Sequence, residues 1–175
     1  MTFATRNAEI LALFTATGKD IPHEDSDMGR AVEILQMICD SQSHTIPFPD
    51  DYDNDATLEE NQENVSEQVS DIFDALEELE ANIGTDDFTL DFDGNEYRLI
   101  KDSEIWEIYV DAIKETVEDC YSDVINLDKM PSFIAVSIDW EKTAQNAYVD
   151  GYGHQFSGYD GSEEEAAGYW IFRVN

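Results

Sequence analysis

The chain has 175 residues, of which 41 are Asp or Glu and only 9 are Lys or Arg, so its formal charge is −32 at neutral pH. Such a charge opposes compaction and disfavours direct binding to nucleic acid or to an anionic membrane. Hydrophobic residues make up 42% of the chain and aromatic residues 11%, which excludes an acidic disordered tail. We therefore expect one folded domain, or two small ones, with a basic partner.

Two helices and a loop are predicted in the N-terminal part. Residues 4–17 have apolar side chains at helical spacing, and Gly18 is a stop signal. Residues 28–41 form the second helix, for which either Ser26 or Asp27 is the cap. The segment that follows, residues 44–56, is rich in proline and aspartate, which is typical of a loop.

The longest predicted helix covers residues 57–82, with Glu60 at the capping-box position. Apolar residues recur at spacings of three and four from Val65 to Ile83, which indicates one continuous buried side. The opposite side is acidic, and neither Lys nor Arg occurs between Thr57 and Gly84. Like charges at this spacing destabilise a helix, so the acidic side calls for a functional reason.

A hairpin is predicted over residues 87–100, because apolar and polar residues alternate on both sides of Asp93-Gly94-Asn95. The C-terminal tail predicts two more short strands around an acidic loop that contains Glu163, Glu164 and Glu165. Its aromatic residues are more typical of core and interface packing than of a stacking platform for bases, which the nearby acids would repel.

Three further helices are predicted in the second half. Ser103 caps a helix over residues 104–123, Pro131 starts a short helix, and Asp139 caps a last one that ends near Val149. The expected fold is therefore α+β, with N-terminal helices that include one long acidic helix, and a small antiparallel sheet of about four strands packed with two further helices. We expect a helical acidic region over residues 1–84 and an α+β region over residues 85–175, or alternatively one continuous domain.

No constellation typical of an enzyme is found. The three histidines are scattered, and neither CxxC, HExxH, a P-loop nor GxSxG occurs. The two cysteines, Cys39 and Cys120, lie on apolar helical patterns and are expected to be buried free thiols. The acidic segment that starts near residue 51 does not match an EF-hand loop, because its sixth position is Ala56 rather than Gly and its twelfth is Gln62 rather than Glu. We thus predict no enzyme activity, no metal site and no cofactor.

Carboxylates at spacings of three and four are candidate phosphate mimics. Residues four apart rise about 6 Å along a helix. Successive phosphates of one DNA strand are separated by a few ångströms more than their ~3.4 Å axial step, so the two spacings are similar. At one charge per ~1.7 Å of duplex, 32 charges equal about 16 base pairs. The predicted partner-binding residues are Asp50, Asp51, Asp53, Asp55, Glu59, Glu60, Glu63, Glu67, Asp71, Asp74, Glu78, Glu163, Glu164 and Glu165.

Residues 130–152 combine a proline-led start at Pro131, the step Ile138-Asp139-Trp140 and an alanine-containing stretch that ends at Tyr148. This segment resembles the closing segment of ArdA-type antirestriction proteins, which plasmids, conjugative elements and phages encode. The resemblance implies an acidic DNA mimic that occupies the DNA groove of a type I restriction-modification enzyme, often as a dimer. The rest of the chain departs from the family's N-terminal pattern, so the resemblance favours the class rather than a particular target.

The sequence therefore predicts a DNA-mimic inhibitor of a bacterial defence system that acts in the host cytoplasm. Its partner would be a basic DNA-binding protein or complex, such as a restriction enzyme or a CRISPR effector, and a homodimer is compatible with the pattern. Two alternatives stay open. One is an acidic binding module or chaperone for a basic protein. The other is a halophile protein whose acidity serves only solvation.

Overall fold

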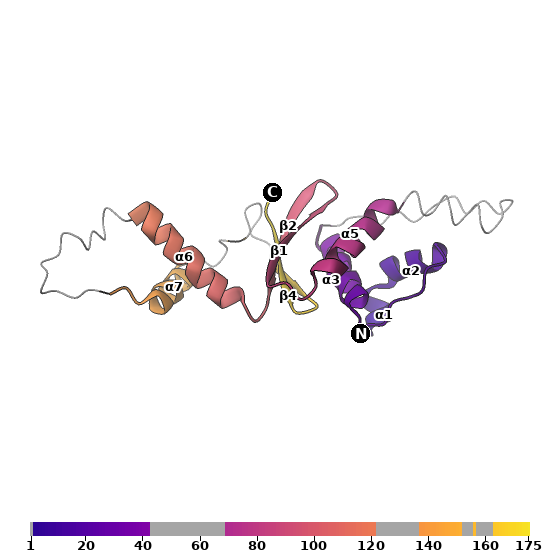
Figure 1. The fold of residues 1–175 in the computed structure, drawn as a ribbon, viewed down its shortest axis with the longest axis horizontal. Helices are drawn as coiled ribbons and strands as arrows, with labels where there is room; N and C mark the ends of the chain where they lie inside the picture. The colour runs from indigo at the N-terminus through magenta and orange to yellow at the C-terminus, as the bar shows by residue number, and fades with distance from the viewer. Residues whose placement is uncertain (1, 43–68, 122–136, 152–155, 157–162) are drawn as a thin grey trace, which may run out of the picture. The chain divides into compact units, whose positions relative to one another are not determined.

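The computed structural model describes residues 2–42, 69–121, 137–151, 156 and 163–175 (Figure 1). They belong to two compact units, one comprising residues 1–101 and 157–175 and the other residues 102–156. The fold is α+β, as predicted, because helices accompany one four-stranded antiparallel sheet. In the described part, no helix is long and apolar enough to cross a membrane.

The sheet lies in the first unit and has the strand order β1-β2-β4-β3. One face of the sheet forms part of the hydrophobic core together with helices α3 (Asp27–Gln42) and α5 (Ser70–Asn82). On the first two strands this face carries Phe88, Leu90, Tyr97 and Leu99. Tyr169 and Ile171 of β4, the strand next to β2, extend this face. The strands are β1 (Asp87–Phe92), β2 (Asn95–Lys101), β3 (Glu163–Ala166) and β4 (Tyr169–Arg173).

The predicted hairpin is confirmed. Phe92 pairs with Asn95, so two residues connect the strands, and both have positive φ, 49° at Asp93 and 73° at Gly94. This combination defines a type I′ turn, whose twist matches that of the strands. The two tail strands are also confirmed, but Glu163–Ala166 is strand β3 itself and not a loop. Charged residues suit this position because β3 is an edge strand.

The first predicted helix is divided in two, α1 (Phe3–Arg6) and α2 (Ala8–Ala16). Asn7 separates them, because its φ of −110° and ψ of 27° are not helical and its buried side chain donates to the carbonyl of Phe3. The predicted stop at Gly18 is confirmed. Gly18 has a φ of 70°, and the next amide donates to the carbonyl of Phe14 in a Schellman arrangement.

Ser26, the first of the two predicted caps, directly precedes helix α3 (Asp27–Gln42). The hydroxyl of Ser26 accepts a hydrogen bond from the amide of Gly29 at 3.0 Å. A Cβ atom at Gly29 would lie 2.1 Å from the carbonyl oxygen of His23, so the close approach of the chain at this cap requires glycine.

Helix α5 (Ser70–Asn82) ends where the longest predicted helix was expected to end. It follows Val69, whose φ of −115° and ψ of 14° are not helical. Its apolar side is buried against α3 and β1, and the ring of Phe73 contacts that of Phe14 edge to face at 5.2 Å. Residues 57–68 and the predicted loop over residues 44–56 lie outside the described residues.

Strand β4 connects the helical and sheet parts of the first unit. The hydroxyl of Tyr169 accepts from the amide of Gly84 at 2.7 Å and donates to the carbonyl of Thr85 at 3.0 Å. Arg30 of α3 donates to the carbonyl of Ala167 beside the same strand at 3.0 Å. The boundary that we predicted at residue 84 therefore lies inside one compact unit, because α5 and the sheet share a core.

The second unit contains α6 (Ile105–Tyr121) packed against α7 (Trp140–Val149). The predicted cap of α7 is confirmed, since Asp139 accepts from the amide of Lys142 at 3.1 Å. Ser103 does not occupy the capping position of α6, because the helix begins at Ile105 and its first backbone bond goes to the carbonyl of Glu104. The hydroxyl of Ser103 instead donates to the carboxylate of Glu104 at 2.8 Å. The short helix predicted at Pro131 lies outside the described residues.

The two cysteines differ, although both were predicted to be buried. Cys39 is buried on α3, whereas Cys120 is exposed near the end of α6, so that prediction is wrong for Cys120. The apolar side of α6 does not continue to Cys120: its last turn is exposed throughout. Burial and then the charge of Asp40 raise the pKa of the Cys39 thiol from 9.0 to about 12.

We expect a thiol reagent at pH 8 to label Cys120 quickly and Cys39 slowly in the folded protein, because only thiolates react. The raised pKa keeps the Cys39 thiol protonated at this pH, and burial restricts access to it. In denaturant both thiols should react at similar rates, as mass spectrometry of labelled peptides would show. Rapid native labelling of Cys39 would contradict the buried position.

Replacement of Leu76 by Ala should lower the free energy of unfolding by about 2–5 kcal/mol, because Leu76 is fully buried between α3 and the sheet. The adjacent exposed change Glu77→Ala is the matched control and should shift it by no more than about 0.5 kcal/mol. Urea unfolding of both variants measures the difference. Equal effects would show that α5 does not contribute its apolar side to the core.

Candidate partner-binding site

The outer face of α5 carries five exposed carboxylates. Asp74 lies near the middle of this face, because the residues on either side of it in helical projection are also exposed. The five acids extend over nine residue steps, which equal about 14 Å of helix axis. This is one charge per about 3 Å, near the ~3.4 Å step of a single DNA strand. The five residues, here named the α5 acidic face, are Asp71, Asp74, Glu77, Glu78 and Glu80.

No carboxylate of the α5 acidic face forms an ion pair among the described residues, and the cation that lies against α5 is Lys19, over the ring of Phe73. Helix α5 itself contains neither Lys nor Arg. The lysines and arginines of the first unit are held by other groups. Arg6 pairs with Glu33, Arg30 with Asp27, Arg98 with Asp87 and Lys101 with Asp86, while Lys19 lies over the ring of Phe73 and Arg173 donates to Gln42 and Asn95.

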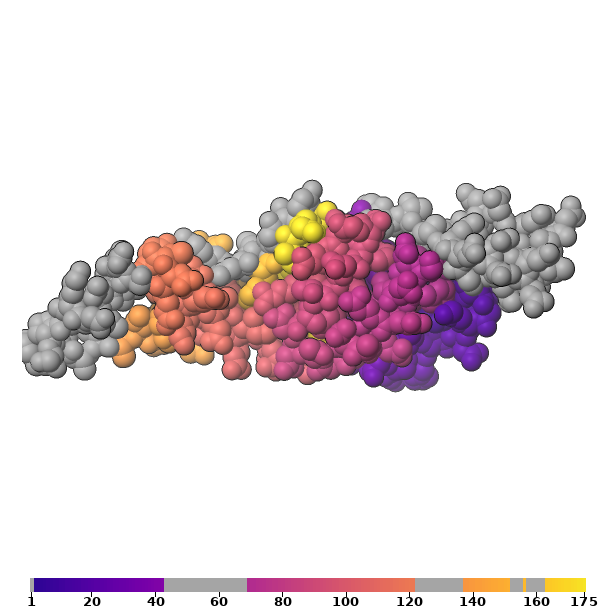
Figure 2. Space-filling view, turned by 45° about the horizontal axis from the view of Figure 1, so that its top comes forward, coloured from indigo at the N-terminus to yellow at the C-terminus, as the bar shows by residue number. Residues whose placement is uncertain are grey.

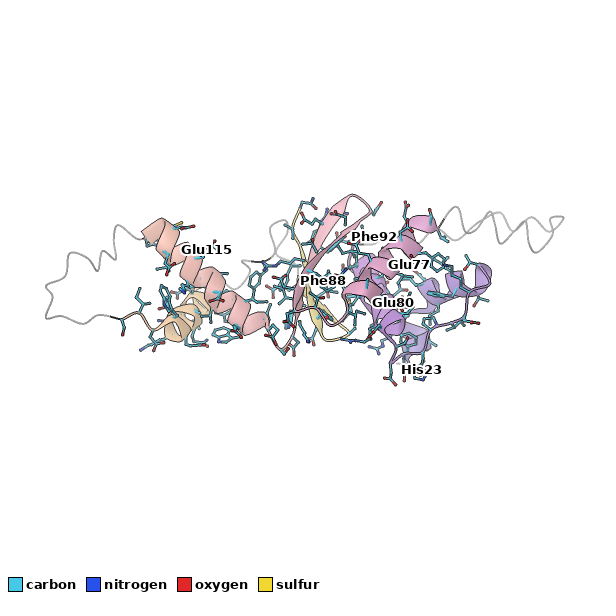
Figure 3. The ribbon with its side chains drawn as sticks, in the orientation of Figure 1. His23, Glu77, Glu80, Phe88, Phe92 and Glu115 are labelled. Carbon is cyan, nitrogen blue, oxygen red and sulfur yellow. The ribbon has the colours of Figure 1, made fainter. Side chains whose placement is uncertain are left out.

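The buried side of α5 fixes the position of this face. Val69, Leu76 and Leu79 are fully buried, so rotation of the helix about its axis would expose leucine side chains to water. Glu77 and Glu80 can be followed along α5 in Figure 3. Figure 2 shows the surface of α5 in magenta beside that of the β1–β2 hairpin in pink. The carboxylates are therefore held on a rigid element rather than on a loop.

Of the predicted site residues, the structure brings Asp71, Asp74 and Glu78 together on α5. Glu163, Glu164 and Glu165 lie apart from them on the edge strand β3, where the first two are half-buried and the third is exposed. Charges on an edge strand have a structural role of their own, since they oppose pairing with another chain. The other predicted residues lie outside the described part of the chain: Asp50, Asp51, Asp53, Asp55, Glu59, Glu60, Glu63 and Glu67.

Two acidic features were missed by the sequence analysis. Glu77 and Glu80 of α5 follow Asp74 at steps of three, which the helical spacing already contained. Helix α6 also carries exposed acids at steps of four, four and three, with one half-buried lysine, Lys114, between them. This second set, named the α6 acidic ladder, consists of Glu107, Asp111, Glu115 and Glu118.

The chemistry available on these faces is the acceptance of hydrogen bonds and the attraction of cations. Within the described residues, no group of three or more His, Cys, Asp or Glu side chains is arranged to hold a metal ion. Comparisons of the chain with protein-family profiles, with curated protein sequences and with solved structures give no match. The acidic faces themselves are therefore the features from which a function is inferred.

Neutralisation of a carboxylate on the α5 acidic face should stabilise the protein at low salt, because like charges four residues apart repel each other by about 0.2–0.5 kcal/mol. Glu78→Gln, which removes the repulsion with Asp74, should raise Tm slightly at low ionic strength, and less when salt screens the charges. The matched control Asp87→Asn should lower Tm, because Asp87 accepts two hydrogen bonds from Arg98 at 2.6 and 2.9 Å. Thermal unfolding at two salt concentrations tests this. A lower Tm for Glu78→Gln would indicate a pairing partner for Glu78.

Proposed function

We propose that the protein is an acidic DNA mimic that inhibits a nucleic-acid-binding complex of a bacterial defence system, such as a restriction-modification enzyme or a CRISPR effector. The observation that carries the proposal is the α5 acidic face. It presents a dense row of carboxylates that form no ion pairs among the described residues, and a buried apolar side holds it in place. Such an inhibitor would act in the host cytoplasm.

The proposed mechanism is competition for a basic groove. Carboxylates on α5 would accept hydrogen bonds from Lys and Arg side chains that otherwise contact phosphates. Because the helix is already folded, little conformational entropy would be lost on binding. The remaining charge of the chain would attract a basic partner over a distance, and this attraction would weaken as salt increases.

The α6 acidic ladder supports the same proposal from the second unit. Glu107 and Glu118 are eleven residues apart, or about 16 Å along the helix axis. Each of the two acidic helices would contact a basic groove through its own carboxylates. The resemblance of residues 130–152 to ArdA-type proteins implies the same class of function, although residues 130–136 and 152 lie outside the described part of the chain.

The test is capture of partners from a bacterial lysate by the immobilised full chain, followed by competition with duplex DNA longer than about 16 base pairs. We expect the captured complex to bind nucleic acid and to be released by the duplex. The double variant Asp74→Lys with Glu78→Lys should lose most of the capture and of the inhibition of DNA binding. Its matched control, Glu24→Lys with Asp25→Lys, makes the same change in net charge on the exposed loop before α3 and should retain both.

Other outcomes would favour the alternatives. A stable ternary complex of the chain, its partner and DNA would indicate a chaperone or binding module. Unfolding in low-salt buffer would indicate a halophile protein. Captured partners that do not bind nucleic acid, or that DNA does not displace, would refute mimicry.

A further inference from the structure

The second unit has a cluster of aromatic rings between α6 and α7. The ring centroids of Trp106, Tyr109 and Tyr148 lie 5.6–6.4 Å from one another. Tyr109 forms the buried base of this cluster with 3% exposure, and Phe156 packs on it edge to face. Trp106 and Tyr148 remain 36% and 56% exposed. The cluster therefore presents two large rings that the described residues do not cover.

Helical spacing places these rings together. On α6, Trp106 and Tyr109 are one turn apart, and on α7 the residues Glu141, Ala144 and Tyr148 form one stripe. Ala144 is fully buried, and its small side chain lets the two helices approach closely. The exposed rings thus lie on a packed helix pair and not on a loop.

A carboxylate is fixed beside the exposed indole. The Nε1–H group of Trp106 donates to Oε2 of Glu141 at 2.8 Å. Glu141 is exposed, and no described lysine or arginine pairs with it, so its other oxygen has no cationic partner among the described residues. An aromatic face and an anionic acceptor therefore lie side by side.

We propose that Trp106, Tyr148 and Glu141 form a binding site for an arginine side chain of a basic partner protein. A guanidinium group is planar and weakly hydrated, so it would stack on the exposed indole and pair with Glu141 at its edge. A lysine ammonium group is strongly hydrated and cannot stack in this way. Glu107 and Asp111 of the α6 acidic ladder supply the complementary negative charge around the site.

The charges of the surface exclude other occupants. The carboxylates beside the rings would repel the phosphates of a nucleic acid, which disfavours stacking of bases. A second copy of this chain would bring a charge of −32 to an acidic surface. Its arginines Arg6, Arg30, Arg98 and Arg173 already bind groups within their own unit. The site requires only an exposed arginine on the partner, so it goes beyond the proposed DNA mimicry and does not depend on it.

The experiment compares hexa-arginine with hexa-lysine, two peptides of equal length and charge, binding to the full chain at physiological salt. We expect a preference of about two- to fivefold for hexa-arginine, the size of an exposed cation–π contact. Trp106→Leu and Glu141→Gln should each reduce this preference towards one. The matched control Glu118→Gln removes one charge from the far end of the ladder and should weaken both peptides equally. The indole N–H resonance of Trp106 can be assigned because it is absent from the spectrum of Trp106→Leu. This resonance should shift more on addition of hexa-arginine than of hexa-lysine.

The change of the preference in the site variants decides the result, because arginine also pairs with carboxylates elsewhere on the chain, and only the contribution of this site is lost in them. Glu141→Gln retains a side-chain oxygen for the Trp106 hydrogen bond, so its effect can be measured even if Trp106→Leu unfolds. No preference in the unmodified chain, or a preference that Glu141→Gln leaves unchanged, would overturn the proposal.

Discussion

Helices α3 and α5 pack their apolar sides against one face of the sheet and remove Leu35, Leu76 and Leu99 from water. Each fully buried leucine stabilises the fold by about 1.5–3 kcal/mol, whereas a like-charge pair on a helix costs about 0.2–0.5 kcal/mol. Burial on one side of α5 therefore outweighs repulsion on the other. The acidic face can exist because the same helix is anchored by its core, and a partner-binding face on α5 requires that core.

The few cations of the first unit have structural tasks. Arg30 connects α3 to the β3–β4 turn, Arg98 holds Asp87 across the hairpin, and Arg173 links β4 to Gln42 of α3. Because these groups are engaged where elements meet, the α5 acidic face is left without counter-charges from them. Cations that pair within the first unit, and acids of α5 that form no ion pair among the described residues, distinguish this surface from an ordinary mixed one.

The two units present acids in different settings. The α5 acidic face lies behind a large mixed core, whereas the α6 acidic ladder belongs to a smaller helix pair whose packing depends on aromatic rings and Ala144. Aromatic groups beside carboxylates offer a guanidinium group more than charge alone, because the ring and the anion contact different parts of it. If the proposed site binds arginine, the second unit would discriminate between basic side chains through this pairing of ring and carboxylate.

Local sequence signals determined much of this fold. The alternation of apolar and polar residues around Asp93-Gly94 specified the hairpin, and Ser26 and Asp139 specified helix caps. The apolar repeat of α5 specified which of its sides is buried. Each of these features depends on neighbours a few residues away in the sequence. Tertiary structure decided the rest. Asn7 interrupts the first helix with a non-helical backbone, while its buried side chain donates to the carbonyl of Phe3. Glu163–Ala166 becomes a strand because β4 pairs with it, and Cys120 is exposed because the last turn of α6 lies outside the core. The contact of Trp106 with Glu141 joins residues 35 positions apart, so no local pattern contained it.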